Sequence, residues 1–338
     1  MRVGLWFIVL GCTWHGACFA AQPAAGGLRL NQIQVVGTHN SYHLRPPAGI
    51  LKAAIAVRKD AKDWDYSRQP LDQQLDQGVR NFELDLNLSS EKGWQVMHVP
   101  GFDGGTTVPT FRDALETISR WSKAHPRHVP ISLLMELKEE GFQLNKSYRR
   151  PTPADVMQLD EQLRAVFPGP RLLSPDDVRG QHKTLWEAVH AGKWPTLADA
   201  AGKVFAILHE NGANRAGYLE GHPALEGRAM FVESDLEQPH SAVLIRNNPN
   251  DPAIDDLARA GYLIRTRVDS QGNIRAAGRE QALRGGAHIL TTDYPHGEIE
   301  ADRAFGFPRL APARVNPVTG PTAARGNELS EPIPESGK

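Results

Sequence analysis

The chain contains eight short, β-rich apolar runs, and helical or polar segments lie between them. This alternation constrains the fold strongly, because parallel strands need crossover segments and eight such strands can close into a barrel. The runs span residues 33–37, 79–86, 95–99, 131–137, 204–208, 229–232, 262–268 and 287–291. Helices are expected at residues 111–124, 153–166, 196–201 and 254–260. We therefore predict an α/β fold, a single (β/α)8-type TIM barrel.

Two connections are much longer than the others. They span residues 40–78 and 139–203 and follow the first and fourth strands, which allows an irregular barrel. Long loops at the carboxyl ends of barrel strands usually shape the functional site. A two-domain α/β protein is the competing interpretation, but no Pro-, Gly- or Ser-rich linker divides the chain. We assign one domain to residues 21–317 and, from its Pro, Gly, Ala and Ser content, a flexible tail to residues 318–338.

The first 20 residues have the features of a signal peptide. Arg2 precedes the apolar run 4–10, and Cys18-Phe19-Ala20 has the small–bulky–small pattern of a cleavage site. The apolar run is far shorter than the roughly 20 residues of a membrane span. We predict a secreted or periplasmic protein that begins near Ala21. The alternatives are an uncleaved anchor or buried strand, and a lipoprotein modified at Cys12 or Cys18.

Cysteine content and charge exclude several kinds of chemistry. Cys12 and Cys18 are the only cysteines, so a chain cleaved after Ala20 has no disulfide, thiolate nucleophile or Cys-based zinc site. The 38 basic residues nearly balance the 39 acidic ones, which argues against a nucleic-acid partner. The sequence predicts no protein partner.

Acidic side chains gather where strand interiors should be apolar. Glu83 and Asp85 share one face of the second strand, because alternate residues of a strand point the same way. Glu136 and Asn40 lie at the ends of the fourth and first strands. Close carboxylates repel each other unless positive charge lies between them, and an all-oxygen ligand set suits calcium or magnesium rather than zinc. The alternative is that these acids pair with Lys138, Arg265 and Arg267.

Two histidines lie at strand ends beside these acids. His39 ends the first strand and His98 the third, and such a pair suits acid–base catalysis near neutral pH. His209 ends the fifth strand, where a site role and a structural role are both open. The chain has no phosphate-binding glycine loop of the P-loop type and no nucleophile elbow around a serine.

These blocks resemble the phosphatidylinositol-specific phospholipases C, in particular the bacterial calcium-dependent branch. Residues 38–43 (THNSYH) resemble the first-strand motif of that family, and residues 71–85 (LDQQLDQGVRNFELD) its second-strand block. Further similar segments follow in the same order, at residues 97–98, 134–136, 185–197, 263–268, 287–295 and 313–317. The resemblance spans residues 30–317 and implies one TIM barrel of the PLC-like phosphodiesterase superfamily.

The resemblance implies a role for each matched residue. His39 and His98 are expected to be catalytic, and the expected calcium ligands are Asn40, Glu83, Asp85 and Glu136. The metal is expected to be one calcium ion, with magnesium as the weaker alternative. Residues that grip the headgroup are not matched by motif, so Lys138, Arg265, Arg267 and Tyr294 are assigned to substrate binding from position alone.

The expected reaction is cleavage of phosphatidylinositol-type lipids to diacylglycerol and a cyclic or open inositol phosphate, with transient contact to a membrane surface. Two rival functions stay open. One is a glycerophosphodiester phosphodiesterase-like enzyme with a soluble substrate. The other is a secreted PLC-like binding module without catalytic activity, although both histidines and all four ligands are present.

Overall fold

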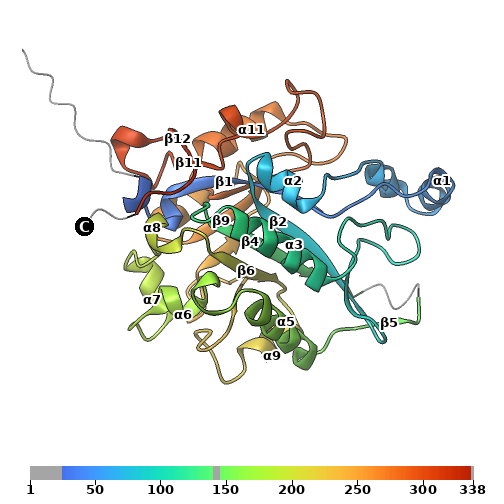
Figure 1. The fold of residues 1–338 in the computed structure, drawn as a ribbon, viewed down its shortest axis with the longest axis horizontal. Helices are drawn as coiled ribbons and strands as arrows, with labels where there is room; N and C mark the ends of the chain where they lie inside the picture. Colours follow the sequence, from blue (N-terminus) through green and yellow to red (C-terminus); the bar gives the residue numbers. More distant parts are fainter. Residues whose placement is uncertain (1–24, 140–144, 336–338) are drawn as a thin grey trace, which may run out of the picture.

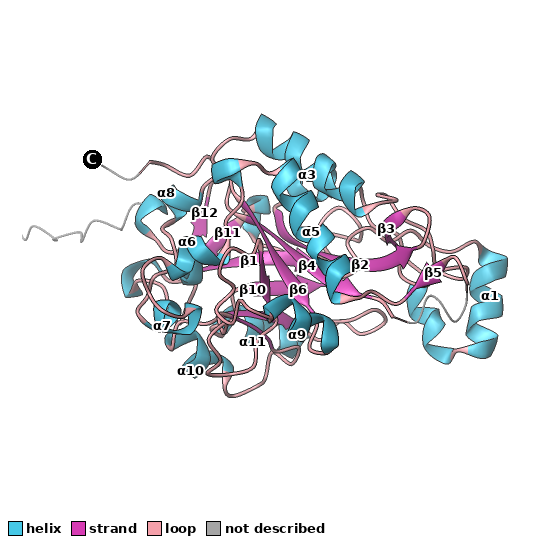
Figure 2. Ribbon diagram, turned by 90° about the horizontal axis from the view of Figure 1, so that it is seen from below, coloured by secondary structure: helices cyan, strands magenta, loops and turns pink. Residues whose placement is uncertain are grey.

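The computed structural model describes residues 25–139 and 145–335, so the expected signal peptide, residues 1–20, lies outside the described residues. Eight parallel strands form the centre, and helices surround them (Figure 2). The strands are β1 (Ile33–Thr38), β2 (Val79–Ser89), β4 (Ile131–Leu137), β6 (Val204–His209), β7 (Met230–Val232), β8 (Val243–Ile245), β9 (Leu263–Arg267) and β10 (Ile289–Thr292).

The sheet is nearly closed into a barrel. Except at β7 and β8, each of these strands pairs in parallel with the next of the eight along the chain, and β10 pairs with β1, as in Val35–Ile289. A single parallel bridge between Glu233 and Val243 joins β7 to β8. The predicted TIM barrel is therefore confirmed, with its weakest seam between β7 and β8.

One predicted strand of the barrel is wrong. The run at residues 95–99 falls partly in β3 (Gly93–Val96), which pairs antiparallel with β2 and stays outside the barrel. Only residues 90–92 separate the two strands, and so short a turn can form a hairpin but not a parallel crossover. The place in the barrel belongs to β8, whose three residues are too few to show a periodic pattern in the sequence.

Two predicted helices have the expected bounds, α3 (Phe111–Ala124) and α5 (Pro153–Val166). Thr110 and Thr152 begin them with capping boxes that use Asp113 and Asp155 three residues later. The shorter helices α8 (Leu197–Ala200) and α10 (Ile254–Arg259) also match. Helices that were not predicted are α1 (Ala48–Val57), α2 (Leu71–Asp76), α6 (Pro175–Arg179), α7 (Leu185–His190), α9 (Ala213–Leu219) and α11 (Ala276–Arg284).

The long connection after β1 contains α1, the 3₁₀ helix η3 (Lys59–Trp64) and α2. Leu51 and Ala54 of α1 pack on Ala61 and Trp64 of η3, so the two helices form a small unit with its own apolar contacts. This α1–η3 hairpin projects from one end of the molecule (Figure 1). The connection after β4 contains β5 (Tyr148–Arg149), which pairs with the end of β2, and helices α5 to α8.

The segment expected to be a flexible tail makes ordered contacts as far as the structure describes it. In it, β12 (Glu328–Leu329) pairs with β11 (Ala313–Val315), which precedes the segment and pairs with β1. Ile333 is fully buried, and Glu331 forms an ion pair with Arg80 near the start of β2. The remaining 3₁₀ helices are η1 (Ala25–Gly27), η2 (Leu30–Gln32), η4 (Gly169–Arg171), η5 (Pro308–Leu310) and η6 (Thr322–Ala324). Within the described residues, no helix has the length and apolar character that crossing a bilayer requires.

Candidate active site

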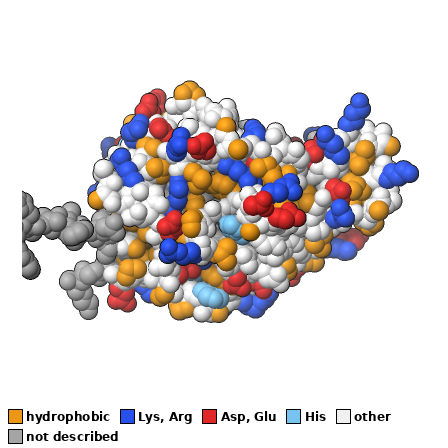
Figure 3. All heavy atoms as spheres, turned by 90° about the horizontal axis from the view of Figure 1, so that it is seen from above, with side chains coloured by type: hydrophobic (Ala, Val, Ile, Leu, Met, Phe, Trp, Pro, Cys, Tyr) orange, Lys and Arg blue, Asp and Glu red, His pale blue; other side chains and the backbone are white. Residues whose placement is uncertain are grey.

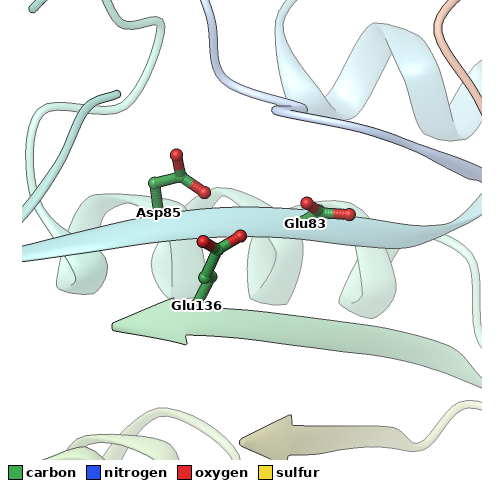
Figure 4. A group of neighbouring side chains, drawn as sticks. All are labelled: Glu83, Asp85 and Glu136. Carbon is green, nitrogen blue, oxygen red and sulfur yellow. The ribbon is translucent and has the colours of Figure 1, made fainter. Parts of the chain in front are cut away.

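Three carboxylates converge at the carboxyl end of the barrel (Figure 4). Glu83 and Asp85 project from one face of β2, and Glu136 comes from β4, where it lies opposite Asp85 in the register of the two strands. One carboxylate oxygen from each residue lies within 4.8 Å of the others. Phe82 and Leu84, on the other face of β2, are completely buried in the apolar core. The alternation of β2 therefore directs its acids to the interior, as predicted.

Basic side chains balance this acidic cluster. Lys138 Nζ lies 3.0 Å from Asp85 and 2.6 Å from Glu136, and buried Arg265 forms an ion pair with Glu83. Burial alone would raise the pKa of Glu83, but Arg265, His39 and Arg267 outweigh it and lower that pKa. The pairing weighed in the sequence analysis as an alternative to metal binding is thus present for Lys138 and Arg265.

Asp85 shows that the basic partners do not satisfy the cluster completely. Its side chain is fully buried, and apart from the Lys138 ammonium group at 3.0 Å its carboxylate oxygens have no hydrogen bond of good geometry among the described residues. Burial raises the pKa of Asp85, and the Glu136 charge adds to the increase despite Lys138. A buried carboxylate with so few polar partners is costly, and a hard cation would stabilise it. Three close carboxylates with only oxygen donors therefore fit a calcium ion.

His39 lies beside the cluster and is oriented by Asp293. Its Nδ1 is 2.8 Å from Asp293 Oδ1, and its Nε2 is 3.6 Å from Glu83 Oε1. Arg68 and Arg267 also contact the Asp293 carboxylate, at 3.1 and 2.7 Å. Burial would raise the pKa of Asp293, but His39 and the two arginines lower it well below its usual range. An ionised Asp293 accepts a hydrogen bond from His39 Nδ1–H and leaves Nε2 for the reaction.

His98 has an equivalent arrangement on the β3 side. Its Nδ1 is 2.7 Å from Asp103 Oδ2. Because Nδ1 is engaged by this carboxylate, Nε2 is the ring nitrogen that can take part in the reaction. Asp103 is completely buried, and hydrogen bonds from His43 and His98 outweigh its burial and lower its pKa. His98 is also a charge neighbour of Asp85. Since Glu83 and Asp85 are two residues apart on β2, the two histidines lie near opposite ends of the acidic cluster.

The structure brings together most of the predicted site residues but not all. Arg267 contacts Asp293 and lies 3.3 Å from His39 Nδ1. Asn40 is buried at the end of β1 in a left-handed conformation (φ 44°), with its side chain within hydrogen-bonding reach of Tyr66. Tyr294 packs instead against Arg279, 5.8 Å from its ring, and Gly272. Its predicted role in substrate binding therefore has no support from its contacts.

A third histidine–carboxylate pair borders the cluster. His209 ends β6, opposite Glu136 in the register, and its Nδ1 lies 2.7 Å from Glu233 Oε2. Burial would lower the pKa of His209, but Glu233, Glu136 and Glu83 raise it. The pair offers both a cationic and an anionic group to a polar ligand in the barrel mouth.

Sequence reasoning missed the residues that orient the histidines. Asp293 directly follows β10, and Asp103 lies in the glycine-rich loop after His98, but neither was predicted as a site residue. Arg68 is buried in the long connection after β1, where it binds Asp293 and the main-chain carbonyl of His39. A buried carboxylate directly after β10 was a usable signal, whereas Asp103 and Arg68 depend on contacts between loops.

Comparisons with known proteins agree with this geometry. The family model "Phosphoinositide phospholipase C, Ca2+-dependent" matches residues 28–93 and 87–317. A calcium-dependent phosphoinositol-specific phospholipase C from Pseudomonas sp. has a TM-score of 0.56 and 21% identity, over 80% of this chain and 92% of that one. A Ca2+-dependent phosphatidylinositol-specific phospholipase C from Streptomyces antibioticus has a TM-score of 0.56 and 22% identity, over 79% of this chain and 95% of that one.

At these identities the solved structures establish the fold alone, and a search of curated protein sequences gives no match. The family model, in contrast, accounts for almost all of residues 28–317 in a chain of 338. Together with the barrel, this match shows that the chain belongs to the calcium-dependent phosphoinositide phospholipase C family.

Proposed function

We propose that this protein is a calcium-dependent phosphodiesterase that cleaves phosphatidylinositol-type phospholipids to diacylglycerol and a cyclic or open inositol phosphate. The observation that carries the proposal is the pair of histidines near the ends of one acidic cluster, each held by a buried aspartate. Such an arrangement supplies a proton acceptor and a proton donor on the two sides of a bound phosphodiester.

The protein's own groups account for the proton transfers. His39 donates a hydrogen bond from Nδ1–H to Asp293 and presents Nε2 to accept the proton of a ring hydroxyl that attacks phosphorus. Attack from within the same molecule has a large proximity advantage. His98 donates a hydrogen bond from Nδ1–H to Asp103, and in its protonated form it presents Nε2–H to the departing diacylglycerol oxygen. Breaking the phosphorus–oxygen bond then releases a neutral alcohol.

Glu83, Asp85 and Glu136, with Asn40 as the predicted fourth ligand, would hold the calcium ion. When bound, the ion supplies positive charge beside the phosphodiester and lowers the pKa of the attacking hydroxyl. Arg267 and Lys138 add positive charge near the same site and remain our predicted contacts for the phosphoryl oxygens. Binding of the headgroup is assigned to the His209–Glu233 pair and is part of this proposal.

A hydrolysis screen tests the proposal directly. Phosphatidylinositol, phosphatidylcholine and deacylated glycerophosphoinositol are offered with calcium, with magnesium and with excess chelator. We expect turnover of phosphatidylinositol with calcium and none in chelator. Turnover of the deacylated substrate alone would instead support a glycerophosphodiester phosphodiesterase. A chain that binds calcium but cleaves none of these substrates would be a binding module.

The substrate also requires contact with a lipid surface, and α1 is our candidate. Ile50, Ile55 and Val57 of α1 are at least partly exposed, with Val57 87% exposed, and Phe102 is exposed in the loop that carries Asp103. Basic side chains lie among apolar ones at this end of the molecule (Figure 3). Trp64 of η3 packs edge-on to His98, with ring centroids 5.4 Å apart, so the hairpin adjoins the site.

Vesicle sedimentation tests this contact. Val57→Ser should weaken binding to vesicles that contain phosphatidylinositol and leave hydrolysis of a soluble inositol phosphodiester unchanged. Leu236→Ser, at an exposed leucine in the loop between β7 and β8, is the matched control. Equal vesicle binding by all three proteins would contradict a role for α1.

Secretion or periplasmic export with cleavage near Ala21 also remains a proposal, and amino-terminal sequencing of the exported protein tests it.

A further inference from the structure

His43 is a buried histidine to which the proposed mechanism gives no role. It lies three residues beyond Asn40, in the segment after β1, and its backbone forms an antiparallel bridge with Thr106. Its side chain has no exposure to solvent. Its ring stacks on Tyr66, with centroids 4.2 Å apart. Both ring nitrogens have polar partners, Asp103 Oδ1 at 2.7 Å from Nε2 and the Tyr66 main-chain carbonyl at 3.1 Å from Nδ1.

Asp103 connects this histidine to the candidate proton donor. One of its carboxylate oxygens contacts His43, and the other contacts His98 Nδ1, both at 2.7 Å. The carboxylate is completely buried, so its orientation depends on these two hydrogen bonds. Without His43, the carboxylate could rotate about its side-chain bonds, and the second oxygen would be buried without a partner.

The partners of His43 also define its protons. A main-chain carbonyl only accepts hydrogen bonds, so Nδ1 must donate to Tyr66, and an ionised Asp103 requires a donor at Nε2. The His43 ring is therefore held by hydrogen-bond acceptors on both sides. The negative charge of Asp103 is shared between two imidazole rings rather than directed at His98 alone.

We propose that His43 is a positioning residue that acts through Asp103 to fix the ring orientation and tautomer of His98. A series of hydrogen bonds links the Tyr66 carbonyl, His43, Asp103 and His98. It directs Nδ1–H of His98 toward Asp103 and leaves Nε2 free to face the leaving group. Backbone contacts support it, because Leu44 donates a hydrogen bond to the Gly105 carbonyl and so joins the two loops. This inference rests on the proposed function for its catalytic consequence but not for its geometry.

The kinetic test compares leaving groups. His43→Phe keeps a ring that can stack on Tyr66 and removes both hydrogen bonds. We expect turnover of phosphatidylinositol to fall about 10- to 100-fold, as for outer partners of functional histidines, with little change in KM or calcium affinity. A substrate with a nitrophenol leaving group needs less protonation and should recover most of this loss. His125→Phe, at an exposed histidine stacked on Trp121, is the control and should behave as wild type.

A double variant tests whether His43 acts through Asp103. If it does, adding His43→Phe to Asp103→Asn should cost little more than Asp103→Asn alone, because residues in one network are not additive. Equal losses on both leaving groups, or additive losses in the double variant, would overturn the proposal. Should His43→Phe fail to fold, His43→Gln retains a donor for Asp103 and should keep turnover between wild type and Asp103→Asn.

Nitrogen NMR of the His98 ring tests the inference without measuring enzyme activity, because the nitrogen signals report the tautomer of the ring. The signals are assigned as those absent from His98→Ala. For the neutral ring of the wild-type protein we expect one tautomer with the proton on Nδ1, and in His43→Phe a mixture of both. A single unchanged tautomer in folded His43→Phe would refute the inference even if the enzyme is active. If the wild type cleaves no phosphodiester, the proposed function fails, and this measurement still decides the role of His43.

Discussion

At the scale of single residues, the site contains acids that are shared between fixed cations and a proposed calcium ion. Lys138 contacts both Asp85 and Glu136, which are also two of the proposed ligands. Burial would lower the pKa of Lys138, but the two carboxylates outweigh it and raise that pKa, so the side chain is a permanent cation. Calcium must therefore bind beside this ammonium group or displace it.

Replacing Lys138 by methionine should therefore tighten calcium binding. Two cations that share the same carboxylates repel each other strongly in a partly buried site, so removing one should raise calcium affinity by about 10-fold or more. Calorimetric titration of the folded protein measures the effect. Lys146→Met, at an exposed lysine, makes the same charge change away from the site and should leave the affinity unchanged. Weaker calcium binding in Lys138→Met would show that the lysine supports the site rather than competes with the ion.

His98→Ala separates proton donation from metal binding. Turnover of phosphatidylinositol should fall about a hundred- to ten-thousandfold, as expected for loss of a general acid. A substrate with a nitrophenol leaving group should recover much of that loss, whereas His39→Ala should not be rescued in this way. Calcium affinity should stay close to wild type, because imidazole is a poor calcium ligand beside carboxylates. Loss of calcium binding in His98→Ala would contradict the division of roles.

At the scale of secondary structure, Asp155 joins two elements of the connection after β4. Its carboxylate caps α5 through Thr152 and forms an ion pair with Arg149 of β5 at 2.6 Å. Arg149 lowers the pKa of Asp155 to about 2, with help from Thr152 against the effect of burial. Because the folded-state pKa is depressed, this stabilisation is present above about pH 4 and is lost as the pH falls through about 2.

Asp155→Ala should therefore lower the free energy of unfolding by about 1–2 kcal/mol at pH 7, the usual cost of losing a helix cap with a charged partner. The difference from wild type should shrink as the pH approaches 3. Urea unfolding at the two pH values measures it. Glu161→Ala, at an exposed position of the same helix, serves as the control. A difference that does not change with pH would mean that the carboxylate charge contributes nothing.

Local patterns explain which elements could be predicted. α3 and α5 have caps and several turns, so their bounds followed from the sequence. β8 has three residues and α9 seven, which is too short for periodicity to emerge. The third predicted strand had the right residues but the wrong partner, because a hairpin and a barrel strand have the same alternation. Glu83 and Asp85 of the proposed calcium site followed from alternation on β2, whereas Asp103 and His43 meet only when two loops fold together.

At the scale of the whole molecule, the carboxyl-terminal segment closes the end of the barrel opposite the site. Arg80 is 3% exposed at the start of β2, and Glu331 is its ion-pair partner at 2.6 Å and also accepts a hydrogen bond from Val129 N. The composition of the segment, from which a flexible tail was predicted, could not indicate these contacts. They depend on buried Arg80, which lies 251 positions before Glu331 in the sequence.

Glu331→Ala should therefore destabilise the whole protein by about 1–3 kcal/mol, since it leaves a buried guanidinium without its charged partner. Thermal unfolding should show a lower midpoint with a single transition. Glu328→Ala, at an exposed position of β12, should have a much smaller effect. Equal midpoints for the two variants would show that water replaces Glu331 at Arg80 without loss.

The length of β2 has a consequence for the entropy of metal binding. β2 runs for 11 residues, and beyond the barrel rim it pairs with β3 and with β5, while β4 flanks its central part. The strand segment with Glu83 and Asp85 is therefore ordered by neighbouring strands before any ligand arrives. The conformational entropy of these ligands is lost during folding rather than on binding, so little of the ion's binding free energy is consumed in ordering them.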